Sequence, residues 1–99
     1  MTRYKVRWSQ EAARDLDHVL EWYFQEAGMS VANKVYSRIK EQTESLATFP
    51  ERARPGREKG TREYVLSRVP YIAVMEVQGE EVWILNLLHM KKKFPQSKK

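Results

Sequence analysis

Cysteine is absent from the 99-residue sequence, which excludes disulfide bonds, thiolate metal ligands and a cysteine nucleophile. Histidine occurs only at His18 and His89, and neither has a partner at metal-ligand spacing, so we expect no metal site and no cofactor. The N-terminal residues lack the apolar segment of a secretory signal, and no apolar run approaches membrane-spanning length. We therefore expect a protein of the cytoplasm with no membrane partner.

The net charge of +5 is unevenly distributed. Residues 1–49 carry seven Lys/Arg and seven Asp/Glu, whereas residues 50–99 carry eleven and six. A positive half of this kind suits RNA, DNA or an acidic protein segment, although it could also be a solvated surface that keeps the protein soluble. Length and an apolar content of 41% predict a single domain over residues 1–95, and we expect residues 96–99 to be a disordered basic tail.

The first half of the chain has the pattern of a strand followed by two helices. Residues 3–8 alternate between basic and apolar side chains, which is the period of a half-buried strand. Apolar residues then recur at helical spacing over residues 10–27, up to Phe24, and again from Val31 to Phe49. We expect Gly28 to end the first helix and Ser30 to cap the second, so that the two helices form an antiparallel hairpin.

The second half has the pattern of a loop followed by strands. Residues 51–61 hold two glycines, a proline and four basic residues, and predict a loop. Strands are expected at 62–68, 71–77 and 81–89, with a tight turn at 78–80. The predicted class is α+β with the order β-α-α-β-β-β, a helix hairpin packed on a small, mainly antiparallel sheet. The nearly continuous apolar run in 81–89 predicts that this strand is central and covered on both faces.

Basic side chains gather on the predicted loop and at its junction with the next strand. Arg57, Lys59 and Arg62 could form an anion site, because guanidinium groups match phosphates and carboxylates. A structural role is the alternative, in which Arg62 pairs with a helix acid such as Asp15 or Glu44 and fixes the loop.

His89 ends the last predicted strand, in phase with Trp83, Leu85 and Leu87, and three lysines follow at 91–93. A neutral imidazole there could act as a base on a ribose 2′-hydroxyl while the lysines hold the phosphate. Alternatively, His89 is a strand-end residue that packs and makes one hydrogen bond.

Three segments resemble the RelE/ParE toxin superfamily, in order and with the right spacing. "YKVRWSQEAARDLDHVLEWY" is similar to its strand followed by W-S/T-x-x-A-x-x-D-L, and "LATFPERARPGREKGTREYVL" is similar to L-x-x-F-P…G-R…G-T-R-E-L-V. "VPYIAVMEVQGEEVWILNLLHMKKKFP" resembles P-Y-I-V-V-Y-R-V…V-x-I-L-R-V-L-H…P. The resemblance covers residues 4–95.

This resemblance implies the toxin of a type II toxin–antitoxin pair. RelE-like members cut mRNA on the ribosome, whereas ParE-like members inhibit DNA gyrase without nuclease chemistry. Both are neutralised by a cognate antitoxin whose acidic or amphipathic segment folds on the toxin, so a hetero-oligomer with the antitoxin is expected.

Departures from the family patterns favour the ParE-like branch. Where RelE-like nucleases carry strand cations, this chain has Glu63, Val65 and Ile72. Two ParE-like arginine positions are also changed, to Glu76 and Asn86, which could alter target recognition or weaken toxicity. Asn86, a polar residue in an apolar strand, needs a partner if it is buried.

The favoured hypothesis is a ParE-like toxin that blocks a protein target, DNA gyrase, without being an enzyme. The alternative is a ribosome-dependent mRNA endonuclease in which Arg62 and His89 are catalytic and Lys91 and Lys92 help to hold the phosphate. A third hypothesis is a degenerate member that only partners its antitoxin. The residues expected to bind target or antitoxin are Arg54, Arg57, Lys59, Arg62, Lys91, Lys92, Lys93 and Phe94.

Overall fold

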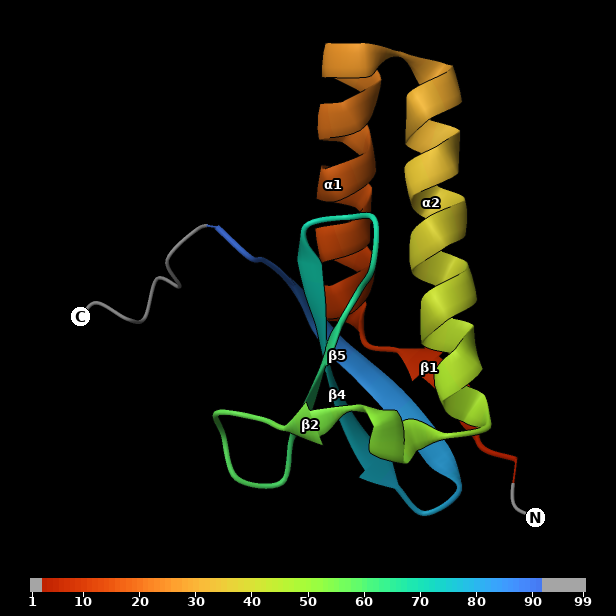
Figure 1. The fold of residues 1–99 in the computed structure, drawn as a ribbon, viewed down its shortest axis with the longest axis vertical. Helices are drawn as coiled ribbons and strands as arrows, with labels where there is room; N and C mark the ends of the chain where they lie inside the picture. The colour runs from red at the N-terminus through yellow and green to blue at the C-terminus, as the bar shows by residue number, and fades with distance from the viewer. Residues whose placement is uncertain (1–2, 92–99) are drawn as a thin grey trace.

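Two helices and a five-stranded sheet make up residues 3–91, the part of the chain that the computed structural model describes (Figure 1). The elements are β1 (Lys5–Trp8), α1 (Gln10–Ala27), α2 (Met29–Glu44), two 3₁₀ turns (Ser45–Ala47 and Pro50–Arg52), β2 (Arg54–Pro55), β3 (Arg62–Val65), β4 (Tyr71–Gln78) and β5 (Glu81–His89). The predicted α+β class and element order are confirmed, and the two-residue β2 is an addition within the segment predicted as a loop. No helix in residues 3–91 is both long and apolar enough to cross a membrane.

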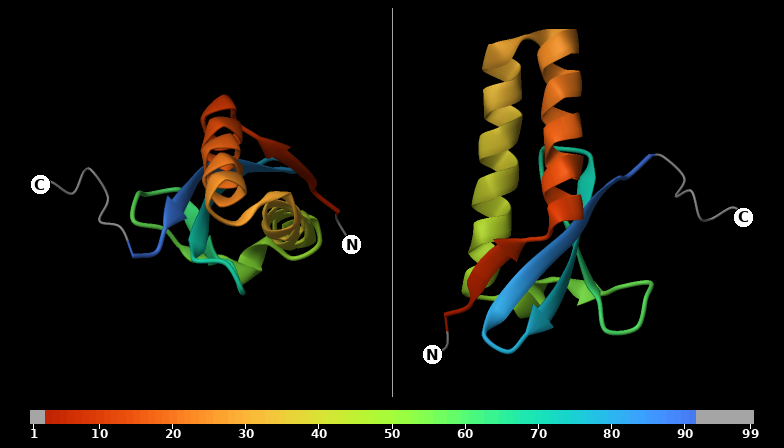
Figure 2. Two further views of the ribbon diagram at one scale, coloured as in Figure 1. Left: turned by 90° about the horizontal axis from the view of Figure 1, so that it is seen from above. Right: turned by 180° about the vertical axis from the view of Figure 1, so that it is seen from behind.

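The sheet has the order β1-β5-β4-β3-β2. β1 runs parallel to β5, and every other neighbouring pair is antiparallel. The prediction that the last strand is central and doubly covered is wrong. β4 is the middle strand, and only Val82, Ile84 and Leu87 of β5 are buried, because the helix hairpin covers one face of the sheet (Figure 2).

A single residue joins the two helices. Ser9 caps α1 as expected, its Oγ accepting the N–H of Ala12 at 3.0 Å. Gly28 follows α1 and has φ +92°, and its carbonyl accepts the N–H of Ala32 in α2. The predicted Ser30 cap is therefore wrong, because α2 begins at Met29. A glycine suits this junction because positive φ strains other residues.

α2 ends at Glu44, five residues before the predicted end at Phe49. Thr43 Oγ1 bonds back to the carbonyl of Ile39 at 2.9 Å, and Ser45 Oγ bonds to that of Gln42 at 2.6 Å. Hydroxyls that bond back to the preceding turn compete with continuation of a helix. The chain then continues through the two 3₁₀ turns, which leave Phe49 exposed.

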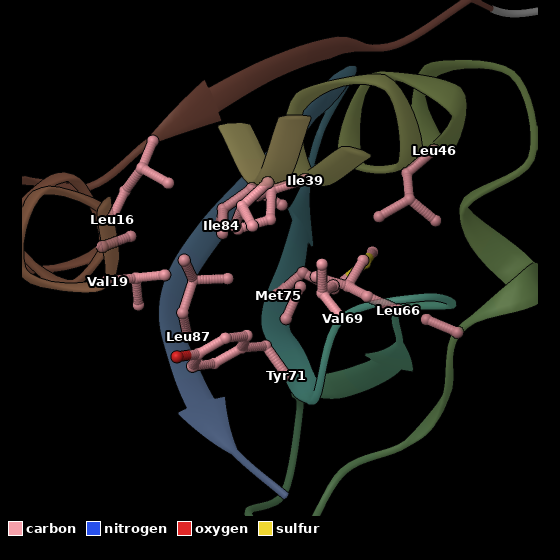
Figure 3. Close-up of a cluster of buried hydrophobic side chains, with 14 of the residues drawn as sticks. Leu16, Val19, Ile39, Leu46, Leu66, Val69, Tyr71, Met75, Ile84 and Leu87 are labelled. Atoms are coloured by element: carbon pink, nitrogen blue, oxygen red, sulfur yellow. The ribbon is translucent and has the colours of Figure 1, made fainter. Parts of the chain in front are cut away.

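The core lies between the helix hairpin and the sheet (Figure 3). Side chains of α1, α2, β4 and β5 meet there, including Leu16, Ile39, Met75 and Ile84. Phe24 was expected to belong to this stripe but is 47% exposed.

A β-bulge interrupts the pairing of β4 with β5. Val74 pairs with Asn86 but Met75 pairs with Ile84, so Leu85 is the extra residue. Asp15 of α1 secures this point: its Oδ2 accepts the Leu87 backbone N–H at 3.0 Å and the Asn86 amide at 3.3 Å. Asp15 is thus the partner of Asn86. The prediction that Trp83 and His89 lie on the same face of the strand is wrong, because the extra residue of the bulge places them on opposite faces.

Candidate functional site

The basic loop, residues 54–62, connects β2 to β3 at the edge of the sheet. Its base is closed by pairing of Arg54 with Glu63 and of Pro55 with Arg62. Within the loop, the Gly56 N–H donates to the Thr61 carbonyl at 2.8 Å. The loop projects from the sheet on the same side as the end of β5 in all views (Figures 1 and 2).

Glu63 is a buried carboxylate at the foot of the basic loop. Its Oε2 accepts the Arg57 backbone N–H at 3.1 Å and lies 3.2 Å from Arg57 Nε. Its Oε1 lies 3.5 Å from Arg54 Nη2. The side chain of Glu63 is 5% exposed, whereas those of Arg54 and Arg57 are 57% and 48% exposed. Both arginines are therefore tied to the sheet at one end and reach solvent at the other.

The other loop cations differ in their surroundings. Lys59 is exposed near the tip of the loop. Arg62 is half-buried, and its Nη1 donates to the Ala53 carbonyl at 2.8 Å. Arg62 thus closes the loop, but the predicted partners were wrong: Asp15 binds the β5 bulge, and Glu44 is exposed at the end of α2.

His89 lies at the end of β5, where its ring packs edge-on against Tyr71 with centroids 5.1 Å apart. Its Nδ1 accepts the backbone N–H of Lys91 at 3.0 Å. These contacts match the packing alternative that the sequence left open. Lys91 is exposed, and Lys92, Lys93 and Phe94 lie outside the described residues.

Arg62 and His89 lie at different points along the sheet. Arg62 pairs with Met75 of β4, whereas His89 pairs with Tyr71, four residues away along that strand. At about 3.3 Å per residue this is about 13 Å, and the two residues are also two strands apart. The structure brings Arg54 and Arg57 together at Glu63, whereas Arg62 bonds to the Ala53 carbonyl and His89 lies apart from all three.

A groove of about 470 Å³ lies between α1 and α2 near the turn of the hairpin. Its apolar lining includes Phe24, Met29 and Tyr36, which are 47%, 59% and 43% exposed. Large exposed apolar side chains gathered in one groove are typical of a binding surface.

Residues 6–94 match the family described as "ParE toxin of type II toxin-antitoxin system, parDE". This chain belongs to the ParE toxin family. It is a toxin of a type II toxin–antitoxin system. It is 36% identical over 96 residues to a Sinorhizobium fredii protein described as "Putative toxin Y4kP", covering 97% of this chain and 98% of that protein.

Solved structures with this fold also come from toxin–antitoxin systems. A chain of the chromosomal ParDE system from P. aeruginosa is 30% identical, with a TM-score of 0.84, covering 90% of this toxin and 98% of that chain. A chain of the RelBE2 complex from Mycobacterium tuberculosis is 24% identical, with a TM-score of 0.58, covering 90% and 93%. This second likeness concerns the fold alone.

Two parts of the site were missed by sequence reasoning. Glu63 was noted only as a departure from a nuclease pattern, although an acid next to a basic loop is itself a signal of an ion pair. The groove residues Phe24, Met29 and Tyr36 were not selected. Phe24 was assigned to the core because periodicity identifies an apolar face but does not show how far the sheet extends beneath it.

Proposed function

We propose that this ParE toxin acts by binding a protein target, DNA gyrase, and blocking it without chemistry of its own. The separation of Arg62 from His89 carries this proposal. A nuclease needs its base and its phosphate-binding cations around one scissile bond. Here Arg62 bonds to the Ala53 carbonyl and pairs with Met75 in the middle of β4, whereas His89 packs on Tyr71 at the start of that strand.

The strand positions that resemble the RelE cation sites support the same proposal. Glu63 is buried and anionic, Ile72 is buried and apolar, and Val65 is apolar and exposed. None of these side chains can stabilise the negative charge that develops on the phosphate in the transition state of RNA cleavage. The surface offered to the target consists instead of the basic loop and the segment Lys91–Phe94, whose last three residues lie outside the described part of the chain.

An antitoxin is the second proposed partner. Its amphipathic helix would lie in the groove between α1 and α2, with apolar side chains against Phe24, Met29 and Tyr36. An acidic stretch of the same antitoxin would bind the basic loop. The two together form a hetero-oligomer in the cytoplasm, where gyrase and DNA are found.

Gyrase and nuclease activities are separated by one pair of assays on the purified toxin. We expect it to inhibit supercoiling of relaxed plasmid by gyrase and to leave translated mRNA uncut in a primer-extension assay with ribosomes. Codon-phased mRNA cuts with normal supercoiling would overturn the proposal in favour of a ribosome-dependent nuclease. Absence of both effects, together with normal growth on overexpression, would indicate a degenerate member.

Truncation tests the proposed target surface. Deleting residues 91–99 should abolish gyrase inhibition but leave the chain folded, because β5 ends at His89. The matched control is Lys98→Gln with Lys99→Gln, which removes charge outside Lys91–Phe94 and should remain inhibitory. His89→Ala should also inhibit gyrase as the parent does; an inactive but folded His89→Ala chain would contradict the non-enzymatic proposal.

The groove is tested by capture of the antitoxin encoded beside the toxin. Phe24→Ala should weaken co-purification, because it removes an apolar wall of the groove. Trp22→Ala is the matched control, since Trp22 is also an exposed aromatic residue of α1 but does not line the groove. Equal losses from both variants would argue against the groove as the docking site.

A further inference from the structure

Glu63 is the one charged side chain that is buried among the residues the structure describes. Its carboxylate accepts the backbone N–H of Arg57 and makes ion pairs with the guanidinium groups of Arg57 and Arg54. Thus one acid at the foot of the basic loop contacts two of its cations and one of its peptide groups.

A buried carboxylate is a costly way to hold a loop on a sheet. An apolar residue of similar volume often packs at least as stably as a buried ion pair, since both charges must lose their water. The neighbouring positions on the same face carry the apolar residues Val65 of β3, which is exposed, and Val74 of β4, which is half-buried. What an apolar residue could not supply is an acceptor that fixes the direction of two guanidinium groups.

We propose that Glu63 is a positioning residue that presents Arg54 and Arg57 as a fixed pair for the carboxylates of an acidic peptide segment. The geometry gives each arginine a tied side and a solvent side, because Glu63 is 5% exposed and the arginines are about half exposed. A guanidinium held in this way loses less side-chain entropy when it binds a carboxylate. The inference rests on the proposed function only for the source of the peptide, the antitoxin.

The test asks whether Glu63→Gln raises or lowers the affinity of the protein for an acidic peptide. Glu63→Gln removes a negative charge from beneath a cationic loop, so charge alone would tighten binding of an acidic ligand. Loss of positioning would weaken it. We expect a short synthetic glutamate-rich peptide to bind Glu63→Gln about tenfold more weakly than the parent, measured by calorimetry at low salt.

Glu58→Gln is the matched control. It makes the same charge change within the basic loop, but Glu58 is exposed, and its backbone carbonyl rather than its side chain bonds to Thr61. We expect it to bind the peptide as tightly as the parent or more tightly. Weakening of both variants to the same extent, or tightening by Glu63→Gln, would overturn the positioning role.

A second variant keeps the proposal testable if Glu63→Gln folds poorly. Arg57→Lys preserves the charge of the loop and leaves Glu63 in place, but a lysine has no planar guanidinium whose direction the carboxylate could fix through Nε–H. We expect about tenfold weaker peptide binding from a chain that still folds. Parent-like affinity in this variant would contradict the inference.

Failure of this inference can be told apart from failure of the proposed function. The peptide assay contains no gyrase, and the gyrase assay contains no peptide. If the parent does not bind the peptide, the inference fails while gyrase inhibition stands. If the parent binds the peptide through Glu63 but does not inhibit gyrase, the proposed target fails and the positioning role remains.

Discussion

Gln42 of α2 bonds both backbone groups of Ser67, in the connection between β3 and β4. Its Oε1 accepts the Ser67 N–H at 2.7 Å and its Nε2 donates to the Ser67 carbonyl at 2.8 Å. The next residue, Arg68, has φ +67°, which strains a non-glycine backbone. The amide of Gln42 therefore holds a strained turn against the helix hairpin.

Gln42→Ala should lower the free energy of unfolding by about 2 kcal/mol, because its two hydrogen bonds to the backbone of Ser67 are lost. Urea unfolding followed by circular dichroism measures this. Glu41→Ala, at the preceding exposed position of α2, should change stability by less than about 0.5 kcal/mol. Similar losses in both variants would mean that the contact with Ser67 contributes little.

Gly28→Ala should destabilise the protein by about 1 to 2 kcal/mol. A methyl group at this position would meet no atom within 4 Å, so the loss comes from the backbone at φ +92° alone. Ser30→Ala is the comparison, and it should be nearly neutral because α2 starts before Ser30. A larger loss for Ser30→Ala than for Gly28→Ala would restore the cap predicted from sequence.

Asp15→Ala should cost about 3 kcal/mol, since the carboxylate accepts two N–H groups at the β5 bulge. The variant should also speed hydrogen exchange at the Leu87 amide. Asp17→Ala removes an equal charge from an exposed position on the same helix and should do neither. Unchanged exchange at Leu87 in Asp15→Ala would show that the bulge is held by other contacts.

Burial, and to a lesser extent the neighbouring Tyr23, raises the pKa of the Tyr71 phenol from 10.0 to about 12. The unfolded chain therefore loses this proton at a lower pH than the folded protein. The contribution of Tyr71 to the free energy of unfolding should be fully present below pH 10. It should fall by roughly 2 to 3 kcal/mol as the pH rises through 12. Tyr71→Phe should lose this part of the alkaline dependence, whereas Tyr36→Phe, at an exposed tyrosine, should keep it.

The sequence was sufficient for the α+β class and the order of the longer elements because each of these has a clear period. The alternation of β1 and the spacing in α1 depend on the burial of one face, which a sequence records directly. The ends of the helices and strands were harder to predict from the sequence. α2 ends early because Thr43 and Ser45 bond to preceding carbonyls, and β2 has only two residues, too few to show a period.

The site was less predictable because it depends on contacts between distant elements. The face of the sheet on which His89 lies is set by the β5 bulge. Asp15 secures that bulge by accepting the N–H of Leu87, which is 72 residues away in the sequence. The arginines of the basic loop were chosen for their charge, but their orientation comes from Glu63, whose burial follows from tertiary packing. Composition located the cations; only the fold identifies the acid that contacts them.

The parallel pairing of β1 with β5 also determines when a newly made chain can become active. The strands are joined by register pairs such as Lys5 with Glu81, and by the ion pair of Arg7 and Glu81, 74 residues apart. Contacts so distant in sequence close a long loop and form late in folding. During synthesis, β1 cannot form its pairing with β5 until β5 has left the ribosome, so the fold of residues 3–91 is completed only after the whole of β5 has been made.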